Sequence, residues 1–319
     1  RFDFWPSWFW PGFQPQLDRL VDELSLQRFA QFEDGDLLVE RSPREAPLRM
    51  KGDASSPPSM RLVGGTGALI AAISGRLGHT QLRTGQTVRR LRRVGAHVEL
   101  DSESAAGEVT TWRVDQVLLA LPPRLAEASI AFEPPLPSDL AKRWRDTATW
   151  MAPHAKYVAI YDAPFWRDQG LSGSARSALG PLAEVHDVSM PGGHAALFGF
   201  VGVPARARRD VPDGVLRAHC RAQLGRLFGE RAATPVADAL KDWAMDSLTA
   251  TDADQDSGGH HGEAPPRCAD GGPWQGCLTG IGSEWSTQFP GYLAGAVEAA
   301  TIGVRDCLAG VGAGPASAR

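Results

Sequence analysis

The sequence predicts a mixed α and β fold made of two interleaved domains. Its 319 residues are enough to bury a large core and to form more than one domain. Alternating apolar and polar residues at 81–91 and 96–100 are typical of strands in a hairpin-rich sheet. Apolar residues at helical spacing over 14–29 and 211–229 predict amphipathic helices. We therefore expect an α+β or α/β architecture.

Composition narrows the class of protein. Hydrophobic residues make up 43% and charged residues 22% of the chain, which is usual for a globular protein. The net charge of -4 and the absence of a basic stripe argue against nucleic acid as a partner. No apolar run has the length of a membrane span. The four cysteines are widely spaced, lack the pattern of metal ligands and fit a reducing cytoplasm; they are Cys220, Cys268, Cys277 and Cys307.

The other segments are read from local patterns. Proline, glycine and polar stretches indicate loops, and short apolar runs predict buried strands. The resulting expectations are a loop at 41–60, a loop running into a helix at 61–78, a buried strand at 115–123, a short helix at 138–150, a strand at 154–161, strands near 170–173 and 196–202, a polar loop at 249–273 and a disordered tail at 309–319.

The most informative stretch is 280–300. Two glycine-rich turns flank Glu284, and Pro290-Gly291-Tyr292 opens a helix. Small residues on one face of that helix let a backbone or a ligand approach closely, and its first N–H groups suit an electron-rich ligand. Glu284 can accept hydrogen bonds from a hydroxyl-bearing ligand. From these residues alone, an ordinary glycine-capped helix on a sheet explains the pattern equally well.

The same stretch carries a family resemblance. Gly282-Ser-Glu, six residues and Gly291-Tyr-Leu-x-Gly-Ala-Val-Glu-Ala is similar to the C-terminal flavin motif of the flavin-containing amine oxidases, the monoamine oxidase family. Three more passages, starting at Val117, Ile130 and Lys156, resemble that family in the same order: Val-x-x-Ala-x-Pro-Pro, Ile-x-Phe-x-Pro-x-Leu-Pro and Lys-x-x-x-x-Tyr-x-x-Pro-Phe-Trp. The resemblance extends from Phe2 to about Leu308.

The resemblance implies an FAD-dependent amine oxidase. A substrate C–H would give a hydride to flavin N5, the imine would be hydrolysed, and oxygen would be reduced to hydrogen peroxide. Lys156 is implied to hold a water against flavin N5, and Tyr292 to form one wall of an aromatic cage that orients the amine. From the residues alone, Lys156 also reads as a snorkelling edge residue. The expected partners are a small-molecule amine and oxygen.

The implied cofactor is non-covalent FAD, since Cys268 lies too close to Gly282-Ser-Glu to match the cysteine of covalent members. Glu284 is implied to hold the ribityl chain, and the backbone of Val88 to meet the adenine. Trp243 is implied to lie by the flavin ring, with a core tryptophan as the alternative. The residues expected to contact FAD are Trp8, Gly64, Gly65, Val88, Pro122, Trp243, Gly282, Ser283, Glu284, Gly291, Tyr292 and Ala296.

Some positions depart from the family pattern. Trp5 stands where glycine is usual, Ile281 and Trp285 are large residues inside the flavin motif, and Cys277 is a further difference. The resemblance implies a second cage aromatic within 249–273, which contains no tyrosine or phenylalanine. We expect one of its histidines, His260 or His261, to take that place, with solvated loop histidines as the alternative.

The resemblance also divides the chain. Residues 1–13, 61–130 and 274–308 are expected to form an incomplete FAD-binding domain. Residues 14–60 form a helical and loop excursion, and 131–273 a substrate domain on a mixed or antiparallel sheet with helices.

No complete G-x-G-x-x-G occurs, and the chain starts at Arg1 rather than Met. We therefore expect a fragment that lacks the β-α-β unit for the FAD pyrophosphate. These residues alone are expected to bind FAD weakly or not at all. The alternatives are a non-catalytic homologue and a flavin desaturase or porphyrinogen-type oxidase.

Overall fold

The computed structural model describes residues 2–4, 6–52, 55–78, 81–256 and 263–312. These form two compact units, each built from two separate stretches. Unit 1 holds the residues up to 77 and those from 152 to 246; unit 2 holds 78–151 and the residues from 247 onward. These compact units have other boundaries than the predicted domains, whose functional assignment stays a prediction. The mixture of sheets and helices confirms the predicted α+β class.

Unit 1 is built on a seven-stranded mixed sheet in the order β14-β10-β13-β12-β11-β2-β3. Every neighbouring pair is antiparallel except β2 and β11, which run parallel. Its strands are β2 (Asp36–Glu40), β3 (Leu48–Lys51), β10 (Ala155–Tyr161), β11 (Leu171–Ser177), β12 (Leu182–Asp187), β13 (Ala195–Val201) and β14 (Ala237–Asp242).

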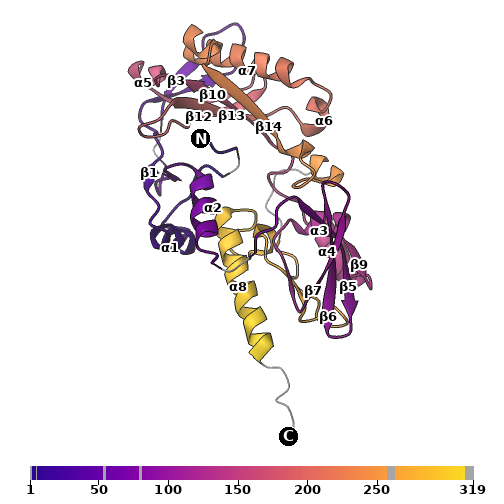
Figure 1. The fold of residues 1–319 in the computed structure, drawn as a ribbon. Coiled ribbons are helices and arrows are strands. Elements are labelled where there is room, and N and C mark those ends of the chain that lie inside the picture. Colours follow the sequence, from indigo (N-terminus) through magenta and orange to yellow (C-terminus); the bar gives the residue numbers. More distant parts are fainter. Residues whose placement is uncertain (1, 5, 53–54, 79–80, 257–262, 313–319) are drawn as a thin grey trace. The chain divides into compact units, whose positions relative to one another are not determined.

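One face of this sheet is covered by helix α7 (Asp213–Phe228), which lies across β10, β13 and β14 in Figure 1. The helix was expected at 211–229, and it ends where Gly229 takes a φ of +92°. Because side chains alternate along a strand, Tyr157 and Tyr161 of β10 join the core under α7. The short helices α5 (Phe165–Asp168) and α6 (Ala205–Arg208) follow β10 and β13.

The opposite face of the sheet is packed by the N-terminal segment. Val158 and Phe198 form a second apolar cluster there, against which Phe2, Phe4 and Trp8 pack. The described residues of 2–13 form one isolated bridge, between Phe9 and Met60. Aromatic packing rather than a strand ladder therefore holds this segment.

The rest of unit 1 comprises α1 (Pro15–Glu23), β1 (Arg28–Ala30), β4 (Met60–Leu62) and α2 (Thr66–Gly75). The helix predicted over 14–29 ends six residues early, because Ser25 turns the chain with a φ of +55° toward β1. The loop expected at 41–60 contains strand β3. The loop-to-helix prediction at 61–78 is confirmed by α2.

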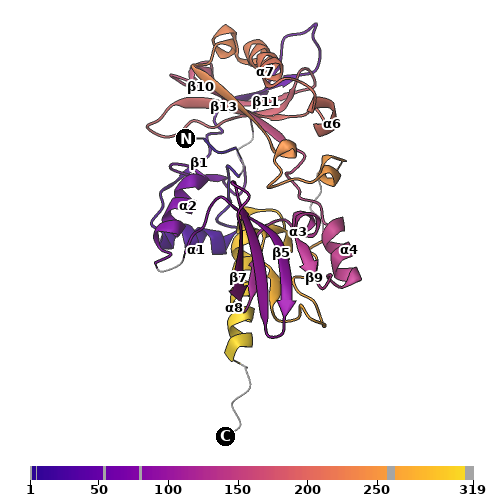
Figure 2. The same cartoon turned by 45° about the vertical axis from the view of Figure 1, so that its right-hand side comes forward.

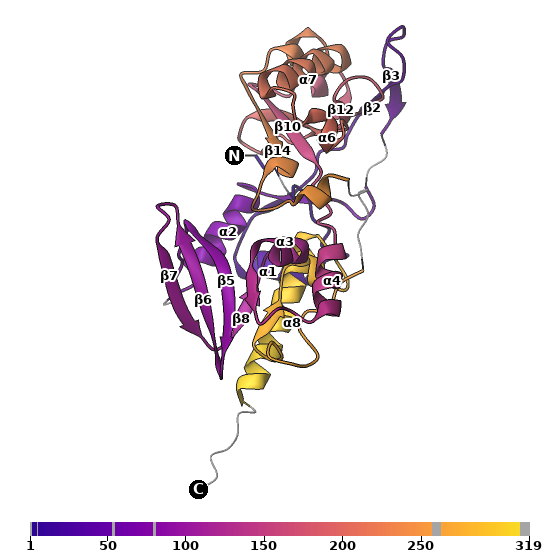
Figure 3. The same ribbon diagram turned by 90° about the vertical axis from the view of Figure 1, so that its right-hand side faces the viewer.

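Unit 2 contains a four-stranded sheet in the order β7-β6-β5-β9. Figure 3 shows β5, β6 and β7 side by side, and Figure 2 shows α4 next to β9. A parallel pair, β8 and β15, brings the strand before the double proline beside the strand before the flavin-like motif. The elements are β5 (Gln86–Val94), β6 (His97–Ser104), β7 (Val109–Val114), β8 (Val117–Leu119), α3 (Pro123–Ser129), β9 (Ala131–Glu133), α4 (Ser138–Asp146), β15 (Leu278–Gly280) and α8 (Leu293–Gly312).

The described residues also form four short 3-10 turns: η1 (Glu230–Ala233), η2 (Trp243–Met245), η3 (Asp252–Asp256) and η4 (Ser283–Trp285). The helix expected to open at Pro290 begins at Leu293. The tail expected from 309 is helical as far as Gly312, and 313–319 lie outside the described residues. No helix within the described ranges has the length and hydropathy needed to cross a membrane.

Candidate functional site

Lys156 lies on β10, on the face of the sheet turned away from α7. The residue is 2% exposed, and its Nζ lies 4.8 Å from the ring centres of both Phe198 and Phe200. Burial lowers the pKa of Lys156 to about 8, and the negative charge of Asp3 opposes that shift. A lysine buried against two rings is therefore poised near neutral pH, unlike an edge lysine at the surface.

Trp8 and Trp243 belong to the same unit as this lysine. The Trp8 ring is 5.4 Å from that of Phe198, and its Nε1 donates to Gln31 Oε1 at 2.8 Å. The backbone N–H of Trp243 donates to the carbonyl of His154 on the edge of β10, and its Nε1 donates to the carbonyl of Phe4 at 2.9 Å. The N-terminal segment thus contains Trp8, which reaches the Phe198 ring that Lys156 contacts, and also accepts the hydrogen bond of Trp243.

Gly64 and Gly65 precede α2 with φ values of +82° and +72°. A Cβ on Gly65 would lie 2.5 Å from Asp3 Oδ1, so the turn requires glycine. The same oxygen accepts hydrogen bonds from Thr66 N at 2.9 Å and Thr66 Oγ1 at 2.8 Å. Asp3 therefore caps α2 from outside the helix, a role that its position in the sequence did not reveal.

In unit 2, Glu284 lies in η4 and is 8% exposed. Burial raises the pKa of its carboxyl, with hydrogen bonding from its own backbone and from Ser283 opposing the shift. A Cβ on Gly282 would lie 3.1 Å from the carbonyl of Leu121, which directly precedes Pro122. Glycine here lets the double-proline passage approach the acid, so Pro122, Gly282, Ser283 and Glu284 lie together.

Gly291 and Tyr292 close the loop between η4 and α8. Gly291 has a φ of +78°, and its N–H donates to the carbonyl of Ser283. The Tyr292 ring packs against that of Trp150 with centroids 5.2 Å apart, and the Tyr292 carbonyl accepts from Ala296 N in the first turn of the helix. Trp150 was not predicted, because nothing in the sequence places residue 150 beside this loop.

Glu298 is a second residue that the prediction missed. It is 3% exposed, accepts a short hydrogen bond from Ser286 Oγ, and accepts another from Gln288 N at 3.3 Å. The sequence could have identified Glu298, because this residue belongs to the Gly-Ala-Val-Glu-Ala motif itself. Gly295 serves the same loop: a Cβ there would lie 2.0 Å from the carbonyl of Phe289. The small residues of α8 thus allow the loop between η4 and α8 to pack closely against the helix. This is the close backbone approach that the sequence predicted.

The large residues of the motif point into the core of unit 2. The Trp285 ring lies 5.4 Å from that of Trp144 and fills the space over Gly280. The Ile281 side chain packs against Gly303 of α8. Cys277 is buried in the same core. These large side chains are therefore accommodated by packing in the core. Trp5, His260 and His261 lie outside the described residues.

Val88, expected at the adenine, is partly buried against this core on β5. Lys156, Trp8, Gly64, Gly65 and Trp243 belong to unit 1, and the other predicted site residues belong to unit 2. Their convergence on one flavin stays a prediction.

Within the described ranges, no three His, Cys, Asp or Glu side chains cluster as metal ligands.

A buried lysine in unit 1, and a buried acid beside glycine turns in unit 2, are features typical of the class of proteins that bind a small-molecule ligand. Residues 4–308 match the family model described as flavin containing amine oxidoreductase, and the chain belongs to that family.

Individual relatives are similar over much of the chain. Putrescine oxidase of Kocuria rosea is 29% identical over 251 residues, covering 73% of this chain and 50% of the relative. Flavin-containing amine oxidase B of Sus scrofa is 28% identical over 266 residues, covering 79% and 48%. The chain thus spans about half the length of the curated relatives it matches.

Solved structures share the fold. Putrescine oxidase bound to putrescine superposes with a TM-score of 0.76 at 18% identity, covering 95% of this chain and 87% of that one. Cyclohexylamine oxidase of Brevibacterium oxydans gives a TM-score of 0.75 at 17% identity, covering 97% and 87%. At these identities the likeness concerns the fold alone.

Proposed function

We propose that this chain forms the flavin-facing and substrate-facing parts of an FAD-dependent amine oxidase. The observation that carries the proposal is Lys156, which is buried on two aromatic rings with a pKa lowered to about 8. Burial of a charged group without a structural need is costly, so such lysines mark functional sites. Family membership identifies the chemistry that this position would serve.

Residues of this chain fit a single flavin that is held non-covalently. Glu284 is a buried carboxyl between the close approach at Gly282 and the positive-φ turn at Gly291, which suits the hydroxyls of a ribityl chain. Gly291, with its positive φ, keeps side-chain bulk away from the start of α8. When bound, the flavin would accept a hydride from the amine carbon and pass the electrons to oxygen.

The chain's own residues would orient the substrate and move no electrons. The Tyr292 ring, supported by Trp150, would form one wall against the amine. An apolar, aromatic surrounding favours the neutral amine, the form that can lose a hydride. Lys156, protonated below a pH of about 8, would donate a hydrogen bond to a water at the reacting edge of the flavin. We place the protein in the cytoplasm, which the four free cysteines support.

The test compares two polypeptides: these 319 residues alone, and the same residues preceded by a β-α-β unit with a G-x-G-x-x-G loop. Charge-assisted hydrogen bonds to phosphate contribute about 1.5–3 kcal/mol each, so losing several weakens binding by about three orders of magnitude. We expect the extended polypeptide to retain FAD, to lose its flavin absorbance when an amine is added without oxygen, and to release hydrogen peroxide when oxygen is admitted.

Two outcomes would contradict the proposal. If the extended polypeptide is folded and colourless, the chain is a non-catalytic homologue. If it binds FAD but no amine reduces the flavin, it belongs to another flavin chemistry, such as desaturation. Tight, stoichiometric FAD binding by the 319 residues alone would overturn the weak-binding prediction while leaving the amine oxidase proposal intact.

A further inference from the structure

Thr149 carries a buried hydroxyl that the fold leaves unused. The residue is 3% exposed, and its Oγ1 has no hydrogen-bond partner among the residues that the structure describes. Its backbone N–H, by contrast, donates to Asp254 Oδ1 at 3.1 Å. A buried hydroxyl without a partner has lost its hydrogen bonds to water and gained none in return, which destabilises the folded protein. Such a group needs an explanation outside the fold itself.

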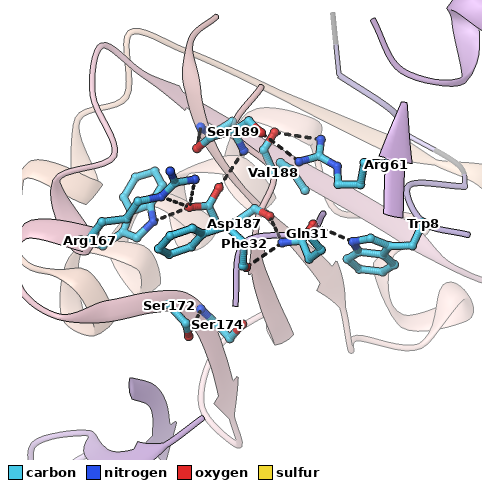
Figure 4. A network of polar contacts seen from close by, with 12 residues as sticks. Trp8, Gln31, Phe32, Arg61, Arg167, Ser172, Ser174, Asp187, Val188 and Ser189 are labelled. Atoms are coloured by element: carbon cyan, nitrogen blue, oxygen red, sulfur yellow. Dashed lines mark hydrogen bonds and ion pairs between the residues drawn. The ribbon is translucent and has the colours of Figure 1, made fainter. Parts of the chain in front are cut away.

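Asp187 shows how this chain usually pairs a buried polar group. Its carboxylate is 1% exposed and accepts hydrogen bonds from Arg167 Nε at 2.8 Å and Ser189 N at 2.7 Å, as Figure 4 shows. In unit 2, Thr251 is the case that matches Thr149, because it bonds to the same carboxylate. Its N–H and its hydroxyl both donate to Asp254 Oδ2, at 2.9 and 2.8 Å. One threonine thus uses both polar groups, and the other uses its backbone alone.

The unpaired hydroxyl lies among residues that are predicted to contact the flavin. Trp150, the next residue along the chain, packs its ring on that of Tyr292 with centroids 5.2 Å apart. Burial raises the pKa of the Glu284 carboxyl, and the negative charge of Asp254 raises it further, so these two carboxylates lie within electrostatic reach. Thr149 is therefore connected, through one neighbour each, to two predicted cofactor residues, and all five residues belong to unit 2.

Thr149 is held in place without a ligand. Asp254, which receives its N–H, is 1% exposed and accepts from Arg124 Nη1 at 2.6 Å. Arg124 is itself 8% exposed and donates from Nε to the carbonyl of Arg145 at 2.8 Å. This chain of buried hydrogen bonds fixes the backbone that carries the hydroxyl. A group that is already ordered loses little conformational entropy when a ligand binds to it.

We propose that Thr149 is a further cofactor-binding residue, whose hydroxyl forms a hydrogen bond with an alcohol group of the flavin ribityl chain. This rests on the proposed flavin function and adds a residue that none of the four family motifs contains. A threonine hydroxyl both donates and accepts, as an alcohol does, so the two groups match. A phosphate would suit this position less well, because the carboxylates of Asp254 and Glu284 would repel its charge.

The first measurement needs no flavin. Thr149→Val replaces the hydroxyl with a methyl group of similar shape, so it should raise the urea concentration at which the 319-residue chain is half unfolded. Thr251→Val is the matched control. It removes a hydroxyl that donates to Asp254, so it should lower that midpoint. Thr149→Ser keeps the hydroxyl and should not raise the midpoint.

The second measurement is the dissociation constant of FAD, followed by flavin fluorescence, in the polypeptide extended by the β-α-β unit. We expect Thr149→Val to weaken FAD binding about five- to tenfold, because one hydrogen bond to the cofactor is lost. Thr149→Ser should remain within about twofold of the parent, since it retains the hydroxyl. Circular dichroism establishes that each variant is folded. A residue with a purely structural role would not gain stability and lose affinity through the same substitution.

The inference is overturned if the midpoint of Thr149→Val does not rise, because the hydroxyl then has a structural partner in the ligand-free protein. It is also overturned if the folded Thr149→Val variant binds FAD as tightly as the parent. Neither measurement uses an amine, so these results would leave the oxidase proposal intact. Conversely, a polypeptide that binds FAD without oxidising amines leaves this inference intact. A folded extended polypeptide that binds no FAD overturns both.

Discussion

The two faces of strand β10 carry adjacent buried polar residues in opposite circumstances. Under α7, the Tyr157 hydroxyl donates to Asp238 Oδ2 at 2.8 Å. On the other face, Lys156 lies over the rings of Phe198 and Phe200. Burial raises the pKa of Tyr157 and lowers that of Lys156, because it favours the neutral form of each. The difference is that Tyr157 is matched by a carboxylate, whereas the lysine ammonium faces aromatic carbon.

The carboxylate under α7 is fully engaged. Asp238 also accepts hydrogen bonds from Arg221 at 2.6 Å and from Arg217, so it is 7% exposed yet paired with two cations. Such a network stabilises the fold and leaves nothing to react. The comparison teaches that a buried polar group indicates stability when ion pairs hold it in a network, and indicates function when burial brings its pKa toward neutral pH.

The largest expected effect is on catalysis. Lys156→Met should slow flavin reduction by an amine about a hundredfold or more, because positioned proton donors and acceptors contribute about 10²–10⁴. Rapid-mixing absorbance of the extended, FAD-loaded polypeptide measures the rate. Tyr157→Phe is the matched control, one residue away on the other face, and should change that rate less than twofold. Equal losses in both variants would mean that β10 supports the site only as a scaffold.

The second effect is a pH dependence of stability. The pKa of Lys156 is about 8 when folded and about 10.4 in an unfolded chain, so the unfolded state binds more protons between these values. The penalty for burying the ammonium is therefore present below pH 8 and disappears as the pH rises toward 10.4. We expect Lys156→Met to be more stable than the parent by about 3 kcal/mol at pH 7, since one pKa unit corresponds to about 1.4 kcal/mol.

That advantage should shrink to near zero by about pH 10.4. Urea unfolding of both proteins at matched pH values measures it, and comparing the two proteins cancels the tyrosines and cysteines that titrate in the same range. A stability difference that does not vary between pH 7 and pH 10 would show that the lysine is not desolvated.

The third effect tests the face under α7. Asp238→Asn should lower the free energy of unfolding by about 2 kcal/mol, since it removes the charge between two arginines that are each about a third exposed. Urea unfolding at pH 7 measures the loss, and flavin reduction by amine should stay within about twofold. A large change in catalysis with unaltered stability would reverse the roles assigned to the two faces.

The smallest effect is expected for Tyr157→Phe, at about 1 kcal/mol of stability, because one hydrogen bond is lost while Asp238 keeps its arginines. The same urea titration measures it. A loss above 3 kcal/mol would indicate that the hydroxyl organises the whole network rather than joining it.

Local patterns predicted most of the elements but not their ends. The helices at 138–150 and 211–229 were recognisable, since their apolar spacing reflects one buried face. The first helix was drawn too long, because the positive φ of Ser25 has no signal in a serine. Strand β3 was missed, since its exposed residues have no alternating burial.

The candidate site was predictable where it is encoded in short motifs. Lys156 and the Gly282-Ser-Glu and Gly291-Tyr passages were identified by their order and spacing. What could not be predicted depends on contacts between distant segments. Trp150 beside Tyr292 is such a contact, and so is the packing of Trp285, the large residue that departs from the motif, on Trp144. Spacing along the chain does not say on which side a residue lies.

The cap that Asp3 provides to helix α2 has a consequence for how the sequence can vary. A side chain at position 65 would collide with the Asp3 carboxylate, so Gly65 cannot be exchanged while the acid is present. The same carboxylate is the charge that opposes the lowered pKa of Lys156. Because Gly65 also has a φ of +72°, position 65 keeps its need for glycine in relatives that replace Asp3, whereas the lysine loses a stabilising charge. Positions 3 and 156 should therefore covary, although they share no local motif.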